Sequence, residues 1–196
     1  MTEQLLADKA EHIIPRNQKA AEDAWAGENL NQPEYGFNRG ELYNLTIESG
    51  TLTKEERFRI NEHILTTIKM LEALPYPDEL STIPRYATTH LETMNGTGYP
   101  RGLTADDLSV PERIIMLANV FEALTAADRP YKKAKTLSVA IFILHQLVEQ
   151  ELMDRDVFEL FLTSGVYKQY AEKFMTSEQI DEVDISKFLR EEERYI

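Results

Sequence analysis

The feature that most constrains this chain is a short segment from His90 to Pro100, with the sequence His-Leu-Glu-Thr-Met-Asn-Gly-Thr-Gly-Tyr-Pro. It places a potential metal ligand, His90, and an acid, Glu92, just before a glycine-rich loop. Gly96 and Gly98 allow backbone angles that other residues avoid and let the backbone approach a ligand closely. Pro100 then fixes the backbone where the loop ends. A purely structural role seldom requires this combination of residues, so we expect the loop to lie at a functional site.

Helical periodicity dominates the rest of the chain, and no convincing run of alternating apolar residues indicates a strand. Capping boxes at Thr53–Glu56 and Ser109–Glu112 mark the starts of two helices, and Gly165 is expected just beyond the end of another. The sequence therefore predicts an all-α fold, an orthogonal helical bundle with the glycine-rich loop between two of its helices. The helices are expected over residues 3–14, 16–26, 41–48, 53–74, 83–94, 109–127, 136–151, 154–163 and 166–174, with a charged helix from about 184 and a loop over 27–40.

The composition excludes several classes of function. The chain of 196 residues carries a formal net charge of −13, which argues against binding to nucleic acid or to a membrane surface. It has no cysteine, so it forms neither disulfides nor thiolate metal sites. No apolar run approaches the roughly 20 residues needed to cross a bilayer, and no signal peptide opens the chain, so we expect a cytoplasmic protein. One basic cluster, either a solvated loop or an anion-binding edge, comprises Arg129, Lys132, Lys133 and Lys135.

A second informative segment runs from Arg113 to Lys132, along a predicted helix and into the loop that follows it. Together the two segments resemble the HD-GYP family, which are all-helical, metal-dependent phosphohydrolases best known for hydrolysing cyclic-di-GMP. The resemblance is close from about Gly50 to Lys135. It implies an HD-domain-like helical bundle with a core at 41–150 and a C-terminal helical extension at 151–196. Residues 1–40 would then be an N-terminal helical extension or the end of an upstream insertion.

The resemblance also assigns metal-binding positions to particular residues. His63 and His90 match metal-binding histidines of the family, and Asn119 occupies the position of a metal-binding aspartate. The metal in active members is a divalent ion, Fe, Mn or Zn. Glu92 matches the glutamate of the family's His-His-Glu triplet. Glu122, one turn beyond Asn119, is expected either to reach the pocket behind these ligands or to serve as an ordinary capping or salt-bridge residue.

The loop and the basic cluster keep further family features. Arg129 and Lys132 match positions that bind nucleotide phosphates, although an ion pair between Arg129 and Asp128 explains that arginine equally well. The Gly-Tyr-Pro loop supports the active site in the family and is implicated in contacts with diguanylate cyclase (GGDEF) partners. We therefore expect a cyclic dinucleotide, a GGDEF-type or other signalling protein, or a second copy of the chain as partner. The residues that keep the loop are Gly96, Gly98, Tyr99 and Pro100.

The chain departs from the family at specific positions. Leu91 replaces the second histidine of the triplet, and leucine has no atom that binds a metal. Asn119 offers only a neutral amide oxygen, and Asn95 replaces an aspartate of the loop. No His-Asp pair occurs, and ungapped counting places Glu34-Tyr35 where that pair would fall. Because a bridging hydroxide nucleophile needs two or more metals, we expect none or one weakly bound metal here.

Three hypotheses follow from this pattern. The first is a degenerate HD-GYP-type bacterial signalling domain that binds a cyclic dinucleotide or a partner protein without efficient hydrolysis. The second is a metal-dependent cyclic-di-GMP phosphodiesterase whose missing His-Asp ligands lie upstream, beyond an insertion. The third is a non-catalytic dimerisation module. Metal content separates the first two, since only the enzyme needs two or more metals per full-length chain.

Overall fold

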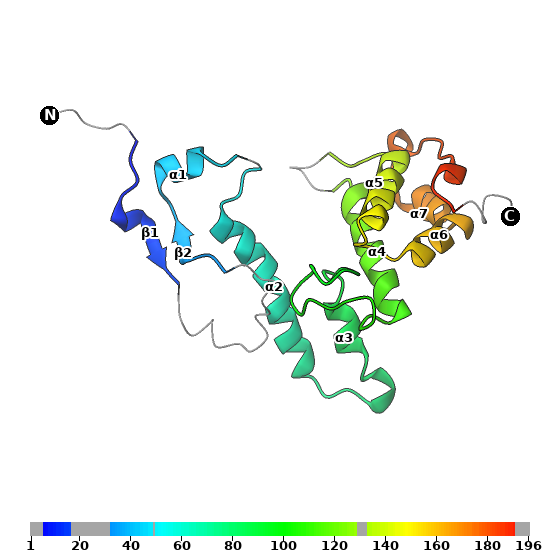
Figure 1. Cartoon of the computed structure of the whole chain (residues 1–196), viewed down its shortest axis with the longest axis horizontal. Coiled ribbons are helices and arrows are strands. Elements are labelled where there is room, and N and C mark those ends of the chain that lie inside the picture. Colours follow the sequence, from blue (N-terminus) through cyan, green and yellow to red (C-terminus); the bar gives the residue numbers. More distant parts are fainter. Residues whose placement is uncertain (1–5, 17–31, 49, 129–132, 191–196) are drawn as a thin grey trace. The chain divides into compact units, whose positions relative to one another are not determined.

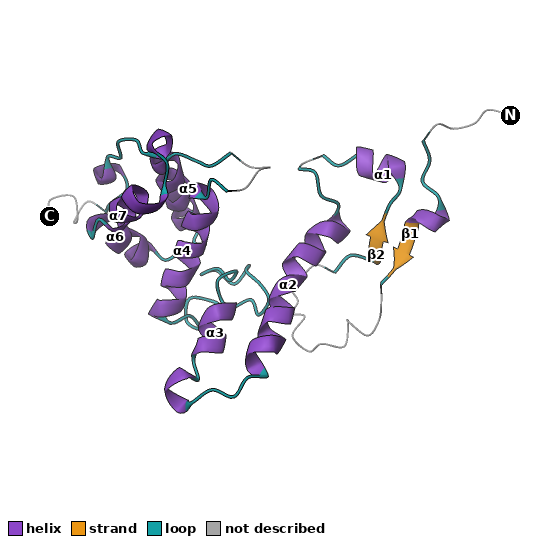
Figure 2. Ribbon diagram, turned by 180° about the vertical axis from the view of Figure 1, so that it is seen from behind, coloured by secondary structure: helices purple, strands orange, loops and turns teal. Residues whose placement is uncertain are grey.

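Figure 1 shows the computed structural model of the chain, which describes residues 6–16, 32–48, 50–128 and 133–190. Within these residues the fold is mainly helical, as predicted, with one small two-stranded sheet (Figure 2). The chain divides into two compact units, Met1–Pro84 and Arg85–Ile196. The boundaries at 40/41 and 150/151 that the sequence suggested stay a prediction. None of the described helices is both long and apolar enough to cross a membrane.

The first unit contains a short antiparallel sheet that the sequence did not predict. Strand β1 (Ile13–Pro15) pairs with β2 (Tyr35–Asn38), and Ile14 lies opposite Phe37. The predicted helix over 3–14 is therefore wrong within the described residues, where 6–9 are not helical and a 3-10 turn (Ala10–His12) leads into β1. The predicted loop over 27–40 is wrong at β2. Strands this short leave no visible alternation, and their pairing joins residues that are distant in sequence. The helix predicted over 16–26 lies almost wholly outside the described residues.

Two helices complete the first unit. Helix α1 (Glu41–Leu45) follows β2, and α2 (Lys54–Glu72) begins at the predicted capping box. The hydroxyl of Thr53 accepts a hydrogen bond from the backbone N–H of Glu56 at 3.2 Å, and the Glu56 carboxylate accepts one from the N–H of Thr53 at 2.9 Å. This exchange satisfies two backbone donors that the first turn leaves without a partner. A 3-10 turn (Asp78–Leu80) comes before the end of the unit.

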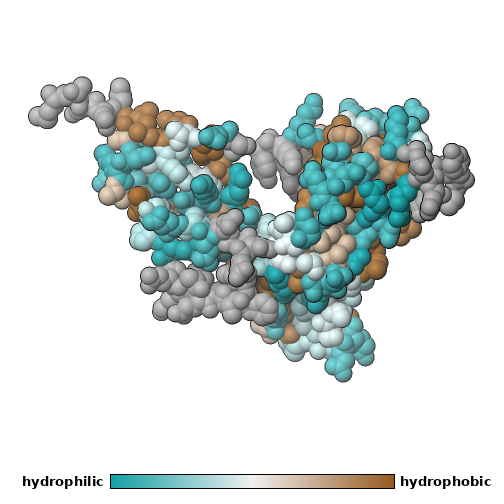
Figure 3. Space-filling model, viewed as in Figure 1, coloured by the Kyte–Doolittle hydropathy of each residue, from teal (hydrophilic) through white to brown (hydrophobic). Residues whose placement is uncertain are grey.

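The second unit is a bundle of helices around one apolar core. After α3 (Ile83–Thr88) it contains α4 (Val110–Thr125), α5 (Leu137–Glu149), α6 (Arg155–Thr163) and α7 (Val166–Phe174). The expected helices agree with α4 to α7 to within one or two residues at each end, and the Ser109–Glu112 capping box starts α4. Hydrophilic residues cover much of the face of this unit seen in Figure 3.

The residues after 150 belong to the same core as α4 and α5. Phe158 and Tyr167, from α6 and α7, are both buried to about 1% exposure or less. The ring of Phe121 on α4 meets those of Phe161 and Tyr170 edge to face, with centroids 5.0 and 5.2 Å apart. Two 3-10 turns, Ser177–Gln179 and Ile185–Lys187, end the described chain, so the helix predicted from about 184 is only a single turn there.

Helix α3 ends earlier than the sequence suggested. The predicted helix over 83–94 is wrong after Thr88, and His90 lies in the loop that follows. The backbone hydrogen bonds explain the difference: the N–H of Met94 donates to the carbonyl of Leu152 at 3.1 Å, and the carbonyl of Met94 accepts from the N–H of Ala105 at 2.8 Å. Partners that are distant in sequence thus replace the helical ones.

The Gly-Tyr-Pro loop folds back onto the chain that leads into it. A Cβ atom at Gly98 would lie 2.4 Å from the Cα of Glu92 and from the N of Thr93, so only glycine fits there. The Glu92 side chain, 3% exposed, then holds the end of the loop. Its two carboxylate oxygens accept hydrogen bonds from the backbone N–H groups of Arg101 and Leu103, at 2.8 and 3.0 Å. The bond between Tyr99 and Pro100 is cis.

Gly98→Ala should destabilise the protein by about 3 kcal/mol or more, because the added methyl overlaps backbone atoms that have no room to move. Gly165→Ala is the matched control. A Cβ at Gly165 meets nothing within 4 Å, so its cost comes only from the positive φ of 73° and should be about 1–2 kcal/mol. Urea unfolding measures both variants, and equal losses would contradict the close approach at Gly98.

Glu92→Gln should lower the free energy of unfolding by about 1–3 kcal/mol, because the new amide group brings a donor toward a backbone N–H that needs an acceptor. Asp106→Asn, at an exposed position of the loop before α4, is the control and should change the melting temperature little. If the Glu92→Gln variant is as stable as wild type, the Glu92 carboxylate does not hold the loop.

Candidate functional site

His90 lies half-buried between α3 and the Gly-Tyr-Pro loop, with its ring held by the backbone. Its Nδ1 atom is 2.9 Å from the carbonyl oxygen of Ala87. A carbonyl oxygen only accepts hydrogen bonds, so Nδ1 is the donor, which in the neutral ring leaves Nε2 with its lone pair. On α2 in the first unit, exposed His63 makes the same kind of contact with the carbonyl of Ile60. Both histidines thus adopt the tautomer in which Nε2 is able to bind a metal.

Asn119 projects from α4 toward the same loop. Its Nδ2 atom donates a hydrogen bond to the carbonyl oxygen of His90 at 3.3 Å, which ties the helix to the loop. An ionised aspartate at this position has no proton to donate and would face the carbonyl oxygen with a negative charge. The amide at position 119 therefore makes a structural contact that an ionised aspartate would not make.

The predicted site residues are divided between the two units. His90, Leu91, Glu92 and Asn119 all lie in the second unit, whereas His63 belongs to the first. Leu91 is half-buried, and its carbonyl accepts a hydrogen bond from the N–H of Tyr99 at 3.2 Å. The remaining predicted residues divide in two: Glu122 is exposed on α4, while Arg129 and Lys132 lie outside the described residues.

The described residues do not fit a metal centre of the family's kind. Nowhere among them do three or more His, Asp or Glu side chains gather closely enough to hold an ion. Near the loop, His90 supplies one imidazole, while the Asn119 amide and the Glu92 carboxylate are engaged with the backbone. A two-metal site needs several anionic donors, and the one buried carboxylate of this loop, Glu92, is already used by the backbone.

The loop is held by hydrogen bonds to the side chain of Asn95. The side-chain oxygen of Asn95 accepts from the backbone N–H of Thr97 at 3.1 Å and from the hydroxyls of Thr97 and Thr93 at 2.7 and 3.0 Å. An amide oxygen performs this acceptor role as a carboxylate would. Tyr99 is half-buried, and this burial raises the pKa of its phenol. The hydroxyl therefore stays protonated at neutral pH.

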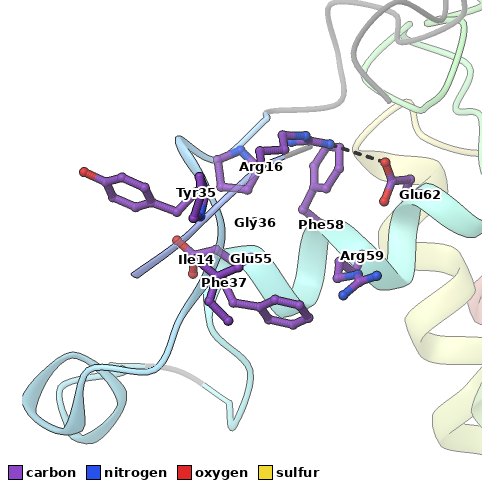
Figure 4. A pocket seen from close by; sticks show the side chains of 11 residues that line it. Ile14, Arg16, Tyr35, Gly36, Phe37, Glu55, Phe58, Arg59 and Glu62 are labelled. Atoms are coloured by element: carbon purple, nitrogen blue, oxygen red, sulfur yellow. Dashed lines mark hydrogen bonds and ion pairs between the residues drawn. The ribbon is translucent and has the colours of Figure 1, made fainter. Parts of the chain in front are cut away.

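The first unit contains a separate cavity of about 220 Å³ between its sheet and α2 (Figure 4). Over one side of it, the guanidinium of Arg16 lies 4.1 Å from the ring centroid of Phe58 and pairs with Glu62 at 3.3 Å. Arg59 lies 4.6 Å from the ring centroid of Phe37. Sequence reasoning assigned these residues no role, because the pairs join the strands to the helix and only the tertiary fold reveals them.

The sequence matches the HD domain family over residues 1–157. It is 36% identical over 97 residues to "3'3'-cGAMP-specific phosphodiesterase 3" of Vibrio cholerae, covering 50% of this chain and 20% of that protein. It is 31% identical over 118 residues to "Cyclic di-GMP phosphodiesterase" of Thermotoga maritima, covering 60% of this chain and 31% of that protein. The chain thus spans between a fifth and a third of the length of these relatives. It belongs to the HD domain family of phosphohydrolases, in the branch that carries the Gly-Tyr-Pro loop.

Proposed function

We propose that this chain is a degenerate HD-GYP-type signalling domain that binds a cyclic dinucleotide or a partner protein without hydrolysing the nucleotide efficiently. The observation that carries this proposal is the hydrogen bond from the Asn119 amide to the His90 carbonyl. Through this hydrogen bond, Asn119, at the position of a predicted ligand, stabilises the fold. Leu91, beside His90, removes a second ligand.

The loss of these ligands bears on the chemistry directly. Activation of water for attack on phosphorus depends on metal ions that lower the pKa of the water and stabilise the charge on the phosphate. Replacing aspartate with asparagine removes one negative charge, and replacing histidine with leucine removes one imidazole. Both changes weaken metal binding, so the nucleophile would not form at a useful rate.

The ligand that we propose is a cyclic dinucleotide. The relatives' names specify cyclic di-GMP and cGAMP, both of which contain phosphodiesters. An acidic chain needs a local positive site to bind such an anion, and the cluster at 129–135 is the strongest concentration of basic residues in the sequence. Arginine and lysine both suit phosphate, as a planar fork and as a point charge.

A phosphodiesterase is the second candidate function. The Nε2 lone pairs of His63 and His90 favour it, as do the relatives' names. In this alternative the missing ligands come from residues outside this sequence.

Metal content and turnover separate the two candidates. Protein purified without chelators should contain at most one equivalent of Fe, Mn or Zn by mass spectrometry, and should bind cyclic-di-GMP in calorimetry without cleaving it. Arg129→Ala should weaken that binding about tenfold by removing a charged phosphate contact. Two or more metals together with turnover in the full-length protein would favour the phosphodiesterase instead.

Restoring the two ligands in a Leu91→His, Asn119→Asp double variant should raise metal affinity if His63 and His90 still converge. Without metal the variant should be less stable by about 1–2 kcal/mol, because the introduced carboxylate cannot donate to the carbonyl of residue 90. Added Mn²⁺ should then raise the melting temperature of the double variant more than that of wild type. Asn119→Ala, which loses the hydrogen bond but gains no charge, is the control. If the double variant binds no more metal than wild type, the inherited site has lost its geometry.

A further inference from the structure

We propose that the cavity between the sheet and α2 in the first unit binds a free amino acid with an aliphatic side chain, such as leucine. The hydrogen bond that carries the proposed function lies in the second unit, so the two proposals are independent of each other. Three properties of the cavity support this ligand. They are its apolar walls, its volume, and two opposite charges on α2 that do not pair with each other.

Apolar side chains from both strands and from the helix form much of the cavity wall. Ile14 comes from β1, Phe37 from β2 and Phe58 from α2 (Figure 4). Phe58 is buried to 5% exposure, and the other two side chains are half-buried. Moving a hydrocarbon group out of water into such surroundings is favourable. The walls therefore suit an aliphatic side chain.

The volume of the cavity restricts the size of the ligand. It measures about 220 Å³. An apolar cavity of about 150 Å³ holds one benzene molecule, and on that scale this one holds about nine non-hydrogen atoms. That is the size of leucine, and it is far below the size of a dinucleotide.

The cavity is lined by a buried carboxylate. Glu55 on α2 is 5% exposed, and its Oε2 atom accepts a hydrogen bond from the hydroxyl of Tyr43 at 3.0 Å. Burial raises the pKa of the Tyr43 phenol, and the hydrogen bond to Glu55 raises it further, so the hydroxyl remains the donor. A neutral phenol does not balance the negative charge, and a carboxylate has lone pairs for further donors. Glu55 therefore favours a ligand with a cationic donor, such as an ammonium group.

A guanidinium lies one turn further along the same helix. Arg59 comes four residues after Glu55, so the two side chains are neighbours on one face of α2. Instead of pairing with Glu55, the Arg59 guanidinium lies 4.6 Å from the ring centroid of Phe37, and no carboxylate of the described residues pairs with it. Stacking covers the face of a guanidinium and leaves its N–H groups able to bind a carboxylate.

The other two charged groups that line the cavity balance each other. Arg16 lies over the ring of Phe58 and pairs with Glu62 at 3.3 Å. Among the described lining residues, only Glu55 and Arg59 are then left without an opposite charge. Charged groups are favourable in a partly buried site only when they are paired. A free amino acid carries an ammonium group and a carboxylate on one carbon atom, so a single ligand supplies both partners.

Calorimetry with L-leucine on the whole chain tests this proposal. Wild type should bind leucine saturably, with its ammonium group at Glu55 and its carboxylate at Arg59. Two analogues each lack one of these charges: 3-methylbutylamine has no carboxylate, and 4-methylpentanoate has no ammonium group. Each should bind about tenfold more weakly than leucine, because one charged hydrogen-bonding partner is missing.

Two substitutions identify the partner of each charge. Arg59→Gln should weaken leucine binding about tenfold without weakening the binding of 3-methylbutylamine, which has no carboxylate to lose a contact. Glu55→Gln keeps an acceptor for the Tyr43 hydroxyl. It should weaken leucine binding by a similar factor without weakening the binding of 4-methylpentanoate.

Arg57→Gln is the matched control, because it removes the same charge from the same helix at an exposed residue that does not line the cavity. It should keep wild-type affinity for leucine. Thermal melts establish that each variant is folded, and if Glu55→Gln does not fold, Arg59→Gln decides. The proposal is overturned if wild type binds no leucine, if the analogues bind as tightly as leucine, or if Arg59→Gln behaves like Arg57→Gln.

Discussion

The second unit depends on a backbone contact that leaves no room for a side chain. Gly98 lies so close to the backbone at Glu92 and Thr93 that any other residue would overlap it. This contact turns the chain back on itself and brings the N–H groups after Pro100 to the Glu92 carboxylate. The position of His90 follows from the same geometry, since it precedes the doubled-back segment and receives the Asn119 hydrogen bond.

None of these contacts requires a metal ion. The carboxylate of Glu92, the amide of Asn95 and the amide of Asn119 all satisfy backbone or hydroxyl partners within the second unit. In a family whose active members use metals, such a loop can stay folded when metal ligands are replaced, because the interactions that shape the loop differ from those that hold the ion. The fold around the loop therefore rests on contacts of its own side chains and backbone.

Sequence reasoning succeeded where the determining interactions are local. The capping boxes at Thr53 and Ser109 lie within four residues, and both helices begin there. It failed where the partners are distant: β1 and β2 pair across more than 20 residues, and the helix expected through His90 ends early because Met94 bonds to Leu152. At the candidate site, residue types predicted which ligands are missing, and this stays a prediction, whereas only the fold showed that Asn119 bonds to the His90 carbonyl.

The C-terminal tail is the clearest case of a role that sequence does not reveal, because Gln179 and Thr125 are separated by 54 positions. Such a bridge has a thermodynamic consequence. Freeing the tail would leave the carbonyl oxygens of Thr125 and Lys135 without the donor that the Gln179 amide supplies, at a cost in stability. Arg190 and Glu159 hold the chain further along the same tail. The tail therefore contributes to the stability of the second unit through contacts that only the fold reveals.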